Sequence, residues 1–196
     1  MIKSLKDSDG RHYSVWAQNQ PMSCTIASLW MGRSLVHQTS FAEGEWSLAQ
    51  RYYYAAVQNA DAPLGLDPKG PQSFKEGTGK QGTLAYRLAS EGFYKDEIYR
   101  ALVSDGLKVE GYKKGRGPLH IDKRKLSATT PALIIVDWLN GGRHMLVAAQ
   151  LSSGGKIVYL DPWGGHLTEQ DNNGSYSAPY GNFGASDIVF YISKGR

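Results

Sequence analysis

The sequence predicts a single α+β domain, with helices in its first half and an antiparallel β-sheet in its second half. Apolar residues at helical spacing occur between residues 24 and 104, whereas β-branched and apolar runs separated by glycine-rich turns follow from residue 131. Helices followed by strands are typical of α+β folds with segregated layers. A chain of 196 residues is long enough for one domain with a substantial core. We therefore expect one domain over residues 1–196.

The composition is that of an ordinary globular chain, with 41% hydrophobic and 20% charged residues. No apolar run approaches the roughly eighteen residues that a membrane helix needs, and residues 1–13 lack the apolar region of a signal peptide. We expect no membrane insertion and production in the cytoplasm. Because the chain has one cysteine, no internal disulfide can form and the thiol stays available.

The net charge of +4 and the pI near 9.0 raise the question of a nucleic-acid partner. The densest basic run, Lys113–Lys125, contains an acidic residue, two glycines and a proline, and no DNA- or RNA-binding motif surrounds it. This composition favours a solvated loop, with an acidic protein partner as the alternative. We expect no nucleic-acid partner.

The first elements in chain order are a short strand and lead-in within residues 1–17, with a turn at Asp7–Gly10, and a helix that begins at Cys24. Apolar side chains give this helix a buried side, as expected of a central helix. A second helix is predicted over Glu45–Val57, and its three successive tyrosines suit packing with a wet edge better than a cofactor site.

The middle of the chain shifts to Gly, Pro, Asp and Lys over Gln58–Gly82, which predicts a long loop at a substrate cleft or a flap. Gly77–Lys80 has some likeness to a phosphate-binding loop but lacks its full spacing and a preceding strand, so we discard that interpretation. Two further helices are predicted over Thr83–Glu91 and Asp96–Ser104, each followed by a glycine.

Three consecutive strands are predicted over Pro131–Trp138, His144–Ala149 and Lys156–Leu160, joined by glycine-rich turns, and Ile188–Ile192 can close the sheet. In an antiparallel hairpin, the start of one strand and the end of the next lie at the same edge. His144 and the residue after the third strand, Asp161, are therefore expected to meet.

Cys24 is the candidate nucleophile, because the N-terminus of a helix lowers the pKa of a thiol. Gln18 lies six residues upstream, so its side-chain amide and the Cys24 backbone N–H can bind an oxyanion beside the sulfur. The plain alternative is that a lone cysteine is a small buried hydrophobe. His144 as base and Asp161 as its orienting group raise the weight of the catalytic interpretation.

A metal or other cofactor is not expected. The four other histidines are scattered without paired spacing, and no second cysteine is available: His12, His37, His120 and His166. His166 follows Asp161 by five residues and can lie near the rim of a cleft, although a surface histidine is the simpler interpretation.

The order Gln18, Cys24, His144 and Asp161 resembles that of the papain-like cysteine peptidases. It is similar above all to the double-glycine leader peptidases that process bacteriocins and to papain-like bacterial effector toxins. Papain has Asn in place of Asp161, and Trp163 follows at the spacing of papain's shielding tryptophan. Thr25 departs from the glycine that leader peptidases usually carry after the cysteine.

The resemblance implies a papain-like fold, with a central helix carrying Cys24 in the helical half and an antiparallel sheet carrying His144 and Asp161. It implies a cysteine protease with Gln18 in the oxyanion hole and substrates with small residues, above all Gly-Gly, before the scissile bond. A basic toxin delivered into a neighbouring cell would also suit an acidic immunity protein as partner.

Three alternatives remain open. The same residues can serve a peptidoglycan amidase, or a deamidase or transglutaminase that acts on protein glutamine. The domain can also be an inactive peptide-binding module.

Overall fold

The computed structural model describes residues 1–57, 84, 87, 92–114, 118 and 120–195. The predicted loop Gln58–Gly82, with Gly77–Lys80 inside it, lies outside the described residues. So does the predicted helix Thr83–Glu91, apart from Leu84 and Arg87.

The described elements confirm the α+β prediction, with helices in the first half and a large antiparallel sheet. In chain order they are β1 (Ile2–Lys6), β2 (His12–Trp16), α1 (Cys24–His37), α2 (Glu45–Val57), α4 (Lys95–Ser104), β3 (Leu107–Lys114), the 3₁₀ turn η3 (Lys123–Lys125), β4 (Ala132–Trp138), β5 (Arg143–Leu151), β6 (Ile157–Asp161), β7 (His166–Gln170), β8 (Ser175–Ser177) and β9 (Phe183–Lys194). None of the described helices is long and apolar enough to span a membrane.

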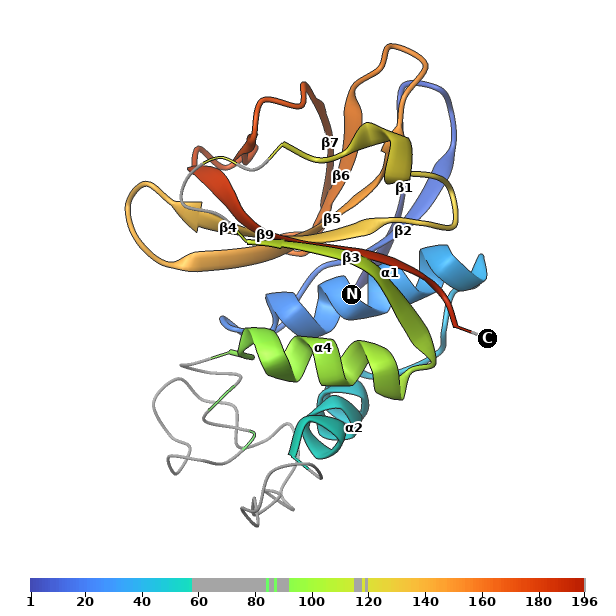
Figure 1. Cartoon of the computed structure of the whole chain (residues 1–196), viewed down its shortest axis with the longest axis vertical. Coiled ribbons are helices and arrows are strands. Elements are labelled where there is room, and N and C mark those ends of the chain that lie inside the picture. Colours follow the sequence, from blue (N-terminus) through green and yellow to red (C-terminus); the bar gives the residue numbers. More distant parts are fainter. Residues whose placement is uncertain (58–83, 85–86, 88–91, 115–117, 119, 196) are drawn as a thin grey trace.

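The large sheet has the strand order β3-β9-β4-β5-β6-β7, with β8 paired to β9, and every pairing is antiparallel. Figure 1 shows α1, α4 and α2 gathered on one side of this sheet, with α1 next to it. The hairpin β1–β2 lies beside the β6–β7 end. The last described strand in the sequence, β9, therefore lies inside the sheet, between β3 and β4.

The two faces of the sheet bury two separate cores because side chains alternate along each strand. On β4, Leu133 and Ile135 face the helices, whereas Ile134 and Val136 belong to the core on the other face. The helix α1 lies very close to the first face. A Cβ atom at Gly32 would come within 2.9 Å of Leu133, so the absence of a side chain there permits this approach.

Several elements differ from the sequence prediction. The first seventeen residues form a two-stranded hairpin rather than one strand and a lead-in. The strands β3, β7 and β8 were not predicted, because their residues are largely polar, and β3 in addition pairs with β9, far along the chain. The basic run Lys113–Lys125 is not a simple loop, since it begins in β3 and ends in η3.

Candidate active site

Cys24 is the first residue of α1, where the helix leaves backbone N–H groups without intrahelical partners. No acidic residue lies in the first turn, so the positive end of the helix dipole is not neutralised locally. The preceding loop is folded on itself, because the Ser23 hydroxyl accepts the Gln20 N–H and donates to the Gln20 carbonyl. The cysteine side chain is buried, with 8% exposure.

His144 and Asp161 are in direct contact across the hairpin of β5 and β6. His144 Nε2 lies 2.6 Å from Asp161 Oδ1, and both residues are buried. The antiparallel pairing of Val147 with Leu160 places the start of β5 and the end of β6 side by side, at the same end of the two strands. Since Nε2 contacts the carboxylate, Nδ1 is the ring nitrogen left to interact with the Cys24 thiol, whose pKa His144 lowers.

The pKa of the Cys24 thiol is lowered despite its burial. Burial is the largest single influence and raises this pKa, but it is outweighed by the hydrogen bond and charge of His144, the Met145 backbone N–H and the Thr25 side chain. Thr25, the next residue of the helix, thus helps to stabilise the thiolate form of Cys24. The arrangement favours a thiolate paired with a protonated imidazole.

The pKa of the His144 imidazole is raised and the pKa of the Asp161 carboxyl is lowered, so both groups favour their charged forms. Burial lowers the pKa of His144, but its contacts with Asp161 and Cys24 outweigh burial and raise it to about 9. Burial raises the pKa of Asp161, yet His144, the Tyr176 hydroxyl and the Trp163 backbone N–H leave it lowered overall. The three groups therefore form one coupled set, with the proton on His144 at neutral pH.

Two tyrosines that sequence reasoning missed complete the surroundings of Asp161. The hydroxyls of Tyr176 and Tyr180 donate to Oδ2 at 2.8 and 3.0 Å, while the Trp163 N–H donates to Oδ1 at 2.8 Å. Both tyrosines lie in the turn-rich tail, where neither helical nor strand spacing marks them. Only the pairing of β8 with β9 brings them over the end of β6.

The aromatic ring stacked on His144 is Trp138, from the end of β4. The two ring centroids are 5.5 Å apart and the planes are 19° from parallel. Trp163, which the papain-like resemblance suggested as a shield, is 46% exposed. Its ring centroid lies 6.3 Å from that of Tyr180. His166 is half-buried rather than on the open surface and lies 6.1 Å from Tyr180.

Gln18 lies in the loop before Cys24, but its amide nitrogen is already engaged. Nε2 donates to the carbonyls of Gln20 and Pro21 at 2.8 and 3.0 Å. Its Oε1 is buried and has no hydrogen-bond partner among the described residues. To donate to a substrate oxyanion, this side chain must exchange one carbonyl contact for the new acceptor.

A buried carboxylate from α2 holds the same loop. Glu45 Oε2 accepts the backbone N–H of Asn19 at 2.9 Å. Burial raises the pKa of Glu45 overall, although the hydrogen bonds from Asn19 and Ser23 act in the opposite direction. Glu45 thus links the second helix to the loop that shapes the approach to Cys24.

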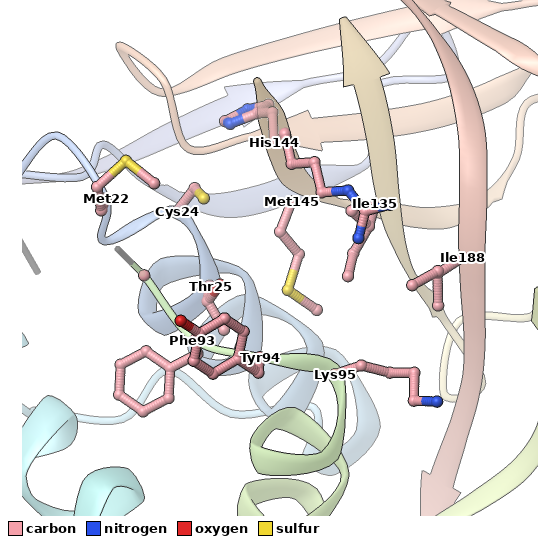
Figure 2. Close-up of a pocket in the computed structure, with 12 residues that line it drawn as sticks. Met22, Cys24, Thr25, Phe93, Tyr94, Lys95, Ile135, His144, Met145 and Ile188 are labelled. Atoms are coloured by element: carbon pink, nitrogen blue, oxygen red, sulfur yellow. The ribbon is translucent and has the colours of Figure 1, made fainter. Parts of the chain in front are cut away.

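Cys24 and His144 face a cavity of about 210 Å³ between the start of α1 and the sheet. In Figure 2, Met22 and Thr25 lie beside the cysteine, and Phe93 and Tyr94 form the wall opposite the strands. The sheet contributes Arg143 and His144 to the wall together with three apolar side chains: Ile135, Met145 and Ile188. The cavity can therefore accept an apolar group next to the thiol.

No group of three or more potential metal ligands occurs among the residues that the structure describes. Comparison of the chain with protein-family models and with curated proteins finds no match in either. The geometry of Cys24, His144 and Asp161 is therefore the basis for a functional assignment.

Proposed function

We propose that the protein is a cysteine peptidase with a papain-like fold, in which Cys24 is the nucleophile, His144 the acid–base group and Asp161 its orienting partner. The observation that supports this most is that the helix N-terminal thiol and His144 face one cavity, while the imidazole is held by a buried carboxylate and the pKa of the thiol is lowered. An inert structural cysteine does not need a lowered pKa or a buried imidazolium beside it.

The proposed reaction is acyl transfer. The Cys24 thiolate attacks a peptide carbonyl carbon, and the proton on His144 passes to the leaving amine as the C–N bond breaks. Water then attacks the thioester, gives a proton to His144 and releases the acid product with regeneration of the thiol. Asp161 stays ionised and holds the imidazole in one orientation throughout.

The oxyanion of the tetrahedral intermediate is bound by the Cys24 backbone N–H, which is free of an intrahelical partner by its place in α1. Gln18 is the second donor in this proposal. Its Nε2 turns from a loop carbonyl to the oxyanion, whose full negative charge makes it the better acceptor.

The substrate class follows from the resemblance and from the cavity. Small residues such as Gly-Gly adjoin the scissile bond, and the apolar wall accepts an apolar side chain further along the peptide. In this proposal the protein is an effector toxin that a secretion system delivers into the cytoplasm of a competing bacterium, with a cognate immunity protein as its inhibitor. The net charge of +4 suits an acidic inhibitor.

The test compares wild type with Cys24→Ala, each produced in bacterial cells. New protein N-termini are labelled and identified by mass spectrometry. We expect new termini after small residues with wild type and none with the variant. A thermal melt of both purified proteins controls for folding, since Cys24→Ala replaces only the buried SH group by hydrogen, a small change in volume.

Wild-type protein that produces no new termini contradicts the peptidase proposal. If toxicity then still depends on Cys24, mass shifts at glutamine side chains indicate deamidation or transglutamination. Lysis confined to periplasmic delivery indicates a peptidoglycan amidase. A thiol inert to iodoacetamide near neutral pH indicates a peptide-binding module without catalysis.

A further inference from the structure

The carboxylate of Asp161 is held on all sides by hydrogen-bond donors. Oδ1 faces His144 Nε2 and the Trp163 N–H, and Oδ2 receives the hydroxyls of Tyr176 and Tyr180. The residue has no exposed surface. Rotation about its Cβ–Cγ bond would break all four contacts at once, so the oxygen that faces His144 is fixed by donors on the opposite side.

Tyr176 is also buried and is packed between two aromatic rings. It is 1% exposed in β8 and lies between Tyr159, with ring centroids 5.2 Å apart, and Trp138, at 6.2 Å. Burial, followed by the charge of Asp161, raises the pKa of Tyr176, so its hydroxyl remains a protonated donor across the neutral range.

Tyr180 approaches the same oxygen from the turn that precedes β9. Its ring centroid lies 6.4 Å from that of Trp138 and 6.3 Å from that of Trp163. Its pKa is likewise raised by burial and by the charge of Asp161. It is only half-buried, in contrast to Tyr176. The two hydroxyls therefore come from two separate segments and converge on one oxygen.

We infer that Tyr176 and Tyr180 are positioning residues of the active site, which act through Asp161 to keep the His144 imidazolium aligned with Cys24. This inference rests on the proposed function of these three residues. Two fixed phenols replace the water that would otherwise solvate Oδ2, so the carboxylate needs no reorganisation while charge moves between the thiol and the imidazole.

The experiment uses Tyr180→Phe, Tyr176→Phe and the double variant, which keep the rings and remove only the hydroxyls. Tyr159→Phe is the matched control, because Tyr159 is 2% exposed, touches the ring of Tyr176 and has no contact with Asp161 among those the structure describes. Two readouts are taken. One is kcat and KM on a peptide cleaved by wild type, and the other is the rate of Cys24 alkylation by iodoacetamide against pH.

Each single variant is expected to lower kcat roughly tenfold with little change in KM, and the double variant roughly a hundredfold, since a hydrogen bond to a charged group is lost each time. Because each hydroxyl donates to the ionised carboxylate, its loss raises the pKa of Asp161. The carboxylate then becomes protonated at higher pH, so the acid limb of both profiles moves upward. Tyr159→Phe leaves kcat and the acid limb unchanged.

The inference would be overturned if both single variants kept kcat within about twofold of wild type and showed no shift of the acid limb of either pH profile. Alkylation needs no substrate and labels the chain's single cysteine, so it decides the role of the tyrosines even if no peptide is cleaved. Failure of the proposed function alone therefore leaves a clear result here. If the buried Tyr176→Phe does not fold, the half-buried Tyr180→Phe decides the matter.

Discussion

The sheet that supplies His144 and Asp161 holds its polar groups differently from the loop that precedes Cys24. At the sheet, both oxygens of Asp161 are paired with protein donors. In the loop, Gln18 Oε1 is buried with no partner among the described residues, and its amide nitrogen is shared between two carbonyls. A fully paired cluster is rigid, whereas an incompletely paired one can rearrange at low cost. The imidazole side is thus preorganised, whereas the Gln18 side chain can adapt to a substrate under the proposed function.

The strongest way to break this comparison is Asp161→Asn. An amide of the same size cannot satisfy all four donors, and it no longer stabilises the imidazolium. We expect kcat to fall by roughly 10³- to 10⁴-fold, as when a triad aspartate loses its charge. Asp137→Asn is the control, since this aspartate is exposed and bonds Arg143 rather than His144. A loss of less than about tenfold in Asp161→Asn would show that the sheet side is not preorganised.

A smaller effect is expected on the loop side, from Gln18→Ala. Loss of one oxyanion donor lowers kcat roughly 10²-fold with KM nearly unchanged. Because Gln18 must first leave its loop carbonyls, we expect the loss to be smaller than that of Asp161→Asn. Steady-state kinetics on the same peptide measure both. Unchanged kcat would assign Gln18 a purely structural role in the loop and leave the Cys24 N–H without its proposed partner.

The smallest effects are expected at two tryptophans near Asp161: Trp138, which stacks on His144, and Trp163, which is half-exposed. Trp138→Ala removes the ring stacked on His144 and should lower the free energy of unfolding by about 2 kcal/mol and kcat by roughly tenfold. Trp163→Ala keeps its backbone N–H to Asp161 and removes a half-exposed ring, so we expect less than about 0.5 kcal/mol. Urea unfolding and kinetics give both values, and the reverse order would restore Trp163 as the shield.

The architecture was largely predictable because α1 and the strands β4, β5 and β6 carry their periodicity in their own residues. The strands β3, β7 and β8 were not, since short or charged strands are defined by the neighbours that they pair with. The pairing of β3 with β9 in particular is a tertiary effect that no local window contains.

The candidate site divides in the same way. Cys24, His144 and Asp161 were chosen by residue type and by their places at element ends, and the structure brings them together. Their catalytic roles stay predictions. Tyr176 and Tyr180 had no such signal, because a tyrosine hydroxyl is marked as important only by the carboxylate it reaches.

The position of β9 between β3 and β4 has a consequence for folding during synthesis. This strand follows every other described strand in the sequence, yet it joins β3 to β4 and carries β8. A growing chain that has reached only residue 182 already contains the thiol, the imidazole, the carboxylate and both phenols. It has nothing to bridge β3 and β4 or to support β8. We therefore expect the site proposed above to be assembled only once β9 has left the ribosome and joined the sheet.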